Sequence, residues 1–260
     1  MSNNTEEQKE NKGSTVQIII PAINLWEKYS KPCIESVKKA TDSRVLFIDN
    51  KSEDETLTEA GKLVSSNFAH KRNEERWSFS QSVNYGVNDA FARGCDYALV
   101  LNNDVLIHSK MIERMIERFQ KGDVGMVTAM DVRGECKNAT DIFLMDDKSK
   151  EEVPESEHPH FSAFMVSREC WEKVGEFDEN FKPAYFEDGD FHYRMKLMGI
   201  KAVLYPPALF YHAGSATQNQ ALGNGQPMVP SPIFENLRAY YVSKWGGVPG
   251  QEVYKTPFGK

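Results

Sequence analysis

The sequence predicts an α/β fold in which helices flank a mixed, mostly parallel central sheet. Short β-branched and apolar runs alternate with amphipathic runs of helical length through the first half of the chain, as in βαβ units. The apolar runs lack a regular polar alternation, which indicates strands buried on both faces. A chain of 260 residues is long enough for one large domain with a small annex.

The first half is expected to contain four strands with helices between them. Pro21 ends the first strand and Gly94 ends the third helix, whose Phe79, Val83 and Val87 recur at helical spacing. The predicted strands are 16–20, 44–48, 69–73 and 97–101. The predicted helices are 28–40, 53–66, 79–92 and 111–119.

The second half is less regular, and its charged, proline-bounded stretch 148–159 predicts a surface loop. Further strands are expected at 124–129, 160–166, 201–205 and 208–212, the last two on either side of Pro206-Pro207. Further helices are expected at 168–174, 188–198 and 234–245. Between the last strand and the last helix, the Gly-, Pro- and Asn-rich stretch 214–232 predicts a long lid loop.

Composition narrows the classes of function. The net charge of −7 argues against a general nucleic-acid binder. The four cysteines form no CxxC pair, so they indicate buried thiols in a reducing compartment, and we expect a cytoplasmic protein. No long apolar stretch predicts a membrane span, and residues 1–14, which are polar, predict a disordered leader.

Two acidic clusters in separate halves are the strongest functional signal. Asp104 lies in Leu101-Asn102-Asn103-Asp104-Val105, directly after a buried strand, where open α/β sheets place ligand-binding groups. Glu187 and Asp188 lie in Tyr185-Phe186-Glu187-Asp188-Gly189-Asp190, at the start of a predicted helix. Together with His212, these carboxylates suggest metal-assisted transfer of a group carried on a diphosphate.

The ordered set of motifs resembles the family-two glycosyltransferases of GT-A fold, and most closely their rhamnosyltransferase-like branch. The resemblance covers about residues 16–215. It rests on the two acidic clusters, on His212 and on three further motifs: Ile48-Asp49-Asn50-Lys51-Ser52-Glu53-Asp54, Ser78-Phe79-Ser80-Gln81-Ser82-Val83-Asn84-Tyr85-Gly86 and Gly175-Glu176-Phe177-Asp178-Glu179. It implies a GT-A domain at 15–215, with a nucleotide-binding half at 15–105 and an acceptor half at 106–215. Residues 216–260 would then form the lid loop and a helical tail.

The resemblance also implies a donor site. The acidic residue that ends the second strand recognises the nucleotide base in this family, and here that residue is Asp49. A turn made by Asp49 with Ser52 is the alternative reading of the same residues. The alternatives to donor binding are a solvated side chain for Arg76 and a position on a helix surface for Asn84. The implied donor-binding residues are Pro21, Ala22, Asp49, Arg76, Asn84 and Asn103.

The family's metal motif is only partly present. Asp104 and His212 match the family's metal ligands, whereas Asn102 replaces the acidic residue expected at the first position of the motif. A carboxylate with an imidazole suits Mn²⁺, with Mg²⁺ as the alternative. Metal affinity is therefore expected to be weaker than with the full motif.

Asp188 is the residue that the resemblance implies as catalytic base, with Glu187 as its alternative. A helix N-terminus favours the ionised form of a carboxyl group, which would keep Asp188 available as a base. The non-catalytic alternative for this cluster is N-terminal capping.

These expectations define an inverting hexosyl- or pentosyltransferase that uses a nucleotide-diphosphate sugar, with UDP ranked ahead of dTDP and GDP. Its acceptor would be a saccharide or another hydroxyl compound. Two alternatives stay open: the same chemistry on hydroxymethylated bases of phage DNA, and a catalytically silent sugar-nucleotide-binding module, which Asn102 favours.

Overall fold

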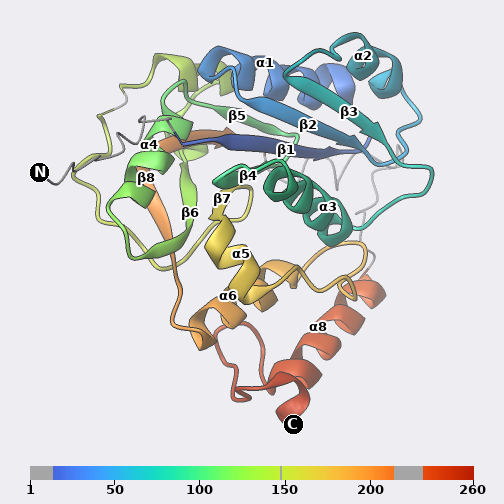
Figure 1. Ribbon diagram of the computed structural model, residues 1–260, viewed down its shortest axis with the longest axis vertical. Helices are drawn as coiled ribbons and strands as arrows, with labels where there is room; N and C mark the ends of the chain where they lie inside the picture. The colour runs from blue at the N-terminus through green and yellow to red at the C-terminus, as the bar shows by residue number, and fades with distance from the viewer. Residues whose placement is uncertain (1–13, 147, 214–230) are drawn as a thin grey trace, which may run out of the picture.

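The computed structural model describes residues 14–146, 148–213 and 231–260 (Figure 1). Within these residues one eight-stranded sheet has the order β3-β2-β1-β4-β7-β6-β8-β5. The strands are β1 Val16–Ala22, β2 Arg44–Asp49, β3 Phe68–Arg72, β4 Tyr97–Leu101, β5 Val105–Ile107, β6 Val124–Asp131, β7 Ala163–Ser167 and β8 Lys201–His212. The order confirms the predicted α/β class.

The sheet is parallel in its first half and mixed in its second. Strands β3, β2, β1 and β4 pair in parallel, as βαβ crossovers require. Strand β7 then lies antiparallel between β4 and β6, and β8 pairs in parallel with β6 and antiparallel with β5. The parallel half therefore presents the carboxyl ends of β1, β2 and β4 along a single edge.

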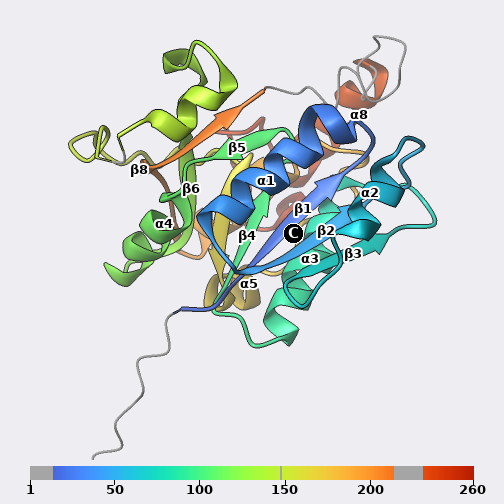
Figure 2. The ribbon, with the colours of Figure 1, turned by 90° about the horizontal axis from the view of Figure 1, so that it is seen from above.

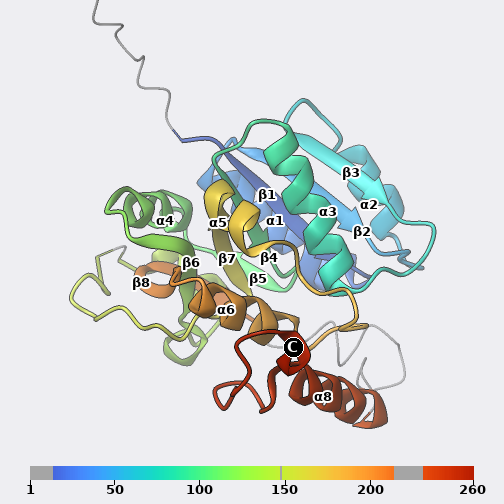
Figure 3. The same ribbon diagram turned by 60° about the horizontal axis from the view of Figure 1, so that its bottom comes forward.

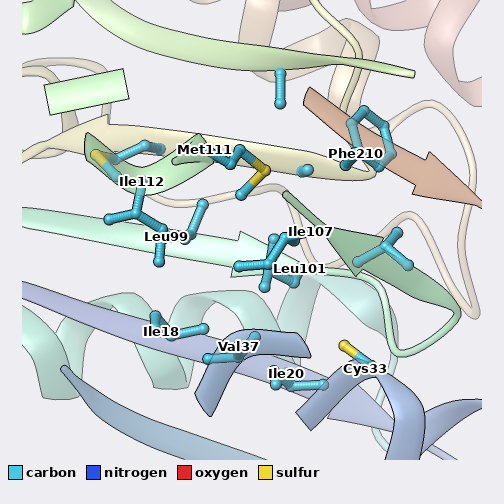
Figure 4. Close-up of a cluster of buried hydrophobic side chains, with 14 of the residues drawn as sticks. Ile18, Ile20, Cys33, Val37, Leu99, Leu101, Ile107, Met111, Ile112 and Phe210 are labelled. Atoms are coloured by element: carbon cyan, nitrogen blue, oxygen red, sulfur yellow. The ribbon is translucent and has the colours of Figure 1, made fainter. Parts of the chain in front are cut away.

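Helices cover both faces of the sheet (Figure 1). One face carries α1 (Lys31–Ala40), α2 (Thr56–Lys62) and α4 (Met111–Gln120), and the other carries α3 (Phe79–Ala92), α5 (Arg168–Val174) and α6 (Glu187–Leu197). Successive residues of β1 point to opposite faces of the sheet. Ile18 and Ile20 pack under α1, and Ile19 packs under α3. Figure 4 shows the first of these cores.

The link between β4 and β5 shows that the sheet curls. These strands occupy the fourth and eighth positions of the sheet, yet only Asn102, Asn103 and Asp104 join them. Four Cα steps reach at most about 15 Å, whereas four strand spacings in a flat sheet amount to about 19 Å. The curl carries β5 back against α1, where Ser36 Oγ accepts a hydrogen bond from the Ile107 N–H at 3.2 Å (Figure 2).

The C-terminal helix α8 (Ser231–Trp245) packs beside α6 (Figure 3). Phe181, Leu237, Tyr241 and Trp245 form a separate apolar cluster there. Buried Asp190 ties the two helices together, because it accepts a hydrogen bond from Trp245 Nε1 at 2.8 Å and pairs with Lys244 Nζ at 2.6 Å. Asp190 Oδ2 also accepts a hydrogen bond from Arg194 Nε at 2.9 Å.

The structure corrects some element boundaries. Strand β5 was not predicted, because three residues carry too little pattern. Helix α2 is shorter than expected, and β8 runs unbroken through Pro206-Pro207. Its pairing with β6 jumps from Tyr205 to Leu209, so both prolines lie in a bulge that needs no ladder hydrogen bond.

The leader, apart from Ser14, and most of the lid loop lie outside the described residues. The division into donor and acceptor halves stays a prediction. Over the described residues, the helices are too short or too polar to cross a bilayer.

Candidate active site

A cavity of about 840 Å³ opens at the carboxyl ends of the parallel strands. This is where doubly wound sheets bind their ligands. Most of the predicted site residues, although far apart in the sequence, line it: Pro21, Ala22, Arg76, Asn103, Asp104, Glu187, Asp188 and His212. The cavity also receives the N-terminus of α3, where Ser78 and Gln81 form a capping box.

Asn84 does not line this cavity. Its amide is buried against the loop before α6, where Nδ2 donates to the Phe177 carbonyl at 2.9 Å and Oδ1 accepts from the Phe177 N–H at 2.9 Å. The same Nδ2 donates to Glu179 at 3.1 Å. Asn84 therefore fixes the 177–179 loop to α3, and its role in donor binding stays a prediction.

Asp49 lies fully buried behind the cavity and does not line it. Oδ1 accepts from the Ser52 N–H at 2.7 Å, which is the turn that the alternative reading predicts, and Oδ2 pairs with Arg72 Nη1 at 2.6 Å. Burial raises the pKa of Asp49, but interactions with His70, Ser52 and Arg72 outweigh it and lower the pKa to about 2. The carboxylate is thus ionised and holds the loop that carries Asn50 into the cavity.

Arg76 and Asn103 both line the large cavity. Arg76 is partly exposed and its Nη2 lies 3.4 Å from Glu53 Oε1, so it is free enough to turn toward a phosphate. Asn103 is buried and donates from Nδ2 to Ser30 Oγ at 3.0 Å. This bond braces the loop that presents Asp104.

Asp104 and His212 are held together as a buried pair. His212 Nε2 lies 3.2 Å from Asp104 Oδ1 but has no hydrogen-bond partner, and Nδ1 lies 3.4 Å from Ser162 Oγ. Adjacent ligands of an octahedral ion with bonds of 2.0–2.1 Å lie about 3 Å apart. An imidazole steadied through its second nitrogen is also typical of metal ligands. The pair therefore fits a divalent ion.

Two further ligand candidates were missed from the sequence. One ligand atom each from Asp131, His160 and His212 lies within 4.8 Å of the other two. Asp131 ends β6 and His160 precedes β7, positions that carry no local motif. Burial, and then the neighbouring His212, lower the pKa of His160, which keeps its imidazole neutral.

The Glu187–Asp188 pair enters the cavity from a constrained backbone. Tyr185 and Phe186, immediately before the pair, both have positive φ angles, of 88° and 72°. Such angles are unfavourable for aromatic residues and persist only where the surroundings impose them. The turn therefore places both carboxyl groups at the start of α6, facing the cavity.

Burial governs the protonation of this pair. Burial, and then the neighbouring charge of Asp188, raise the pKa of Glu187 to about 8. Glu187 Oε2 has no hydrogen-bond partner. Burial also raises the pKa of Asp188, although the backbone N–H groups of Gly189 and Asp188 lower it in part. The expected lowering by the helix terminus is therefore corrected, because desolvation exceeds it.

A smaller cavity of about 330 Å³ adjoins the first. The two cavities share Pro159, Phe161, Tyr185 and Asp188, and α8 contributes Phe234 to the wall of the smaller one. The Phe234 ring lies edge-on to Tyr185, with centroids 5.4 Å apart. Asp188 thus stands at the junction of the large cavity and a smaller one with aromatic side chains in its wall.

Comparison with known proteins agrees with this geometry. Residues 17–140 match the model of the family described as Glycosyl transferase family 2. A curated relative, a galactofuranosyl glycosyltransferase of Leishmania donovani, is 40% identical over 65 residues. That match spans 25% of this chain and only 15% of the relative.

Two solved structures share the fold. The crystal structure of GalNAc-T7 with UDP, GalNAc and Mn²⁺ has a TM-score of 0.67 at 17% identity and covers 91% of this chain and 49% of that chain. The crystal structure of S. aureus TarS 1-349 has a TM-score of 0.59 at 15% identity and covers 88% and 71% of the two chains.

Proposed function

We propose that this chain, whose residues 17–140 match the model of glycosyltransferase family 2 and whose fold is of GT-A type, transfers a sugar from a nucleoside diphosphate to an acceptor hydroxyl. The observation that carries the proposal is the single cavity that gathers Asp104, His212 and Asp188 from distant parts of the chain. A carboxylate–imidazole pair and an acidic base then face the same space.

The donor occupies the large cavity. Its base and ribose lie against Pro21, Ala22 and the loop held by Asp49, and its diphosphate reaches toward Asp104 and Arg76. UDP is ranked ahead of dTDP and GDP, in part because the GalNAc-T7 structure holds UDP in the same fold. About 840 Å³ suits a ligand of nucleotide-sugar size.

Asp104 and His212 would hold the divalent ion, Mn²⁺ or Mg²⁺, and the ion would supply positive charge to stabilise the departing diphosphate. The GalNAc-T7 structure contains Mn²⁺, which supports this assignment by fold alone. Arg76, which also lines the cavity, would supply a second positive charge.

Asp188 acts as the base in a single inverting displacement. Its carboxylate takes the proton of the acceptor hydroxyl, the acceptor oxygen bonds to the anomeric carbon, and the bond from that carbon to the diphosphate breaks. A pKa raised by burial makes Asp188 a stronger base than an exposed aspartate. The acceptor enters from the smaller cavity, whose aromatic walls suit the apolar face of a saccharide ring.

The test measures nucleotide binding first and sugar transfer second. UDP, dTDP and GDP are titrated calorimetrically with and without Mn²⁺, and transfer is then measured with sugars of the preferred nucleotide. Asp188→Asn should leave nucleotide binding intact and slow transfer by about 10²- to 10⁴-fold. The exposed control Asp42→Asn should keep full activity. Near-wild-type transfer by a folded Asp188→Asn variant would refute the base assignment.

The two alternatives are less well supported. Lys244, one of the basic residues that a DNA-binding surface would use, is buried between Asp178 and Asp190. The silent-module alternative rests on Asn102, and any turnover of a sugar nucleotide would exclude it.

A further inference from the structure

We propose that His160 supplies the metal ligand that the acidic motif lacks at Asn102. This inference rests on the proposed function, because the ion concerned is the one that the donor diphosphate would bind. It assigns a role in this chain to a residue outside the recognised motifs.

The sheet register brings His160 to the site. Strands β4 and β7 pair antiparallel with Leu101 opposite Ala163, and the Asn102 N–H continues the ladder by donating to the Ser162 carbonyl at 2.9 Å. His160 lies two residues before Ser162, and both His160 and Asp104 line the large cavity. The segment that leads into β7 and the link that follows β4 therefore bring these two residues to the same cavity.

His212 reaches the same place from β8. It pairs with Val105 across the β5–β8 ladder, directly beside Asp104. Its ring centroid lies 6.0 Å from that of His160, and the two rings are nearly perpendicular. One ligand atom of His160 also lies within 4.8 Å of one of His212, and His212 Nε2 lies 3.2 Å from Asp104 Oδ1. Imidazole and carboxylate groups are ligands that transition-metal ions take.

His160 Nδ1 is buried and has no hydrogen-bond partner, and His212 Nε2, which also makes no hydrogen bond, lies 3.2 Å from Asp104 Oδ1. A buried polar atom without a partner is unfavourable, and a bound ion would satisfy His160 Nδ1. His160 also lines the large cavity, which gives an ion access to it.

The neighbouring groups are less suited to complete the site. Asn102 offers a neutral amide in place of a carboxylate, and its backbone is already tied to Ser162. Asp131 is partly neutralised, because its Oδ2 lies 3.2 Å from Arg133 Nη2 and its Oδ1 accepts from the Arg133 N–H at 2.9 Å. We therefore assign His160 as the ligand and Asp131 as an outer carboxylate.

The experiment measures the metal directly. MnCl₂ is titrated into the full chain with saturating UDP, and bound Mn²⁺ is examined by pulsed electron paramagnetic resonance, which counts coordinating imidazole nitrogens. The wild-type protein should show two such nitrogens. His160→Gln should show one, with Mn²⁺ affinity at least about tenfold weaker. The exposed control His158→Gln should match the wild type.

A rescue variant tests whether His160 compensates for Asn102. Asn102→Asp restores the acidic ligand, so adding His160→Gln to it should weaken Mn²⁺ binding by a smaller factor than His160→Gln does alone. Equal factors in the two backgrounds would overturn the compensation.

The wild-type spectrum is decisive even if a variant fails to fold. A wild-type complex with only one coordinating imidazole would overturn the inference and leave the proposed function standing. A wild-type protein that binds UDP but no Mn²⁺ would overturn the inference and remove the ion from the proposed mechanism. Retention of transfer by Asp188→Asn would refute the base assignment while leaving the His160 inference untouched.

Discussion

Replacing Glu187 by glutamine should remove a large part of the pH dependence of stability. Glu187 is 6% exposed, and burial raises its pKa from 4.5 to about 8. Between these values the folded side chain keeps its proton while the unfolded one is ionised. Stability contributed by the protonated form is therefore fully present below pH 4.5 and is lost as the pH rises toward 8.

The magnitude follows from proton linkage. Each pH unit in this window lowers the free energy of unfolding by about 1.4 kcal/mol through Glu187 alone. From pH 5.5 to pH 7.5 the loss should be about 2 to 3 kcal/mol, since both ends of the interval are partly titrated. Glu187→Gln keeps the shape of the side chain and cannot ionise, so its stability should fall less over the same interval.

The assay is urea unfolding at pH 5.5, 6.5 and 7.5, compared between the wild type and Glu187→Gln. Glu152→Gln, which changes an exposed carboxyl group, is the matched control and should parallel the wild type. Other titrating groups are common to all three proteins and cancel in the comparison. If wild-type and Glu187→Gln stabilities ran parallel across the interval, Glu187 would titrate normally and the argument from burial would fail.

Two further predictions concern the framework of the site. Gly86→Ala should lower the free energy of unfolding by about 1–3 kcal/mol, because an added Cβ would overlap the Ile19 side chain between α3 and β1. Thermal melting measures this loss. The control is Gly61→Ala, whose added Cβ meets open space and which should be neutral or slightly stabilising. Lys244→Met should cost about 3–5 kcal/mol, since it leaves Asp178 and Asp190 buried without their shared cation. A loss no larger than that of the exposed control Lys196→Met would show that the two carboxylates do not depend on Lys244.

The sequence predicted the parallel half of the fold well because that half follows local rules. Strands 97–101 and 44–48 matched β4 fully and β2 to within one residue, since each is an apolar run bounded by polar residues. Strand β5 escaped prediction because its three residues are defined by pairing with β8, which is a nonlocal event. Pro206-Pro207 indicated a break that the bulge instead absorbs.

The site, like the fold, has residues that local motifs predict and residues whose placement depends on distant contacts. Asp104, Asp188 and His212 carry motifs that can be recognised in order along the chain, and they line one cavity. Asp49 and Asn84 carry comparable motifs but are turned into the framework by hydrogen bonds to Ser52 and Phe177. Side-chain direction depends on partners distant in sequence, so motif position alone could not separate these two outcomes.

The sheet order gives a physical reason why the loss of one acidic residue need not abolish an ion site here. Asp104, His160 and His212 come from three different strand ends, and the ladders β4–β7 and β5–β8 fix where those ends meet. Backbone pairing, and not the side chain of Asn102, therefore sets the positions of the residues proposed as ligands. A change at one strand end leaves the others in place, and a side chain on the facing strand can take over its coordination. On this argument the ion site is a property of converging strand ends, which is why its completion by His160 can be tested without altering Asp104 or His212.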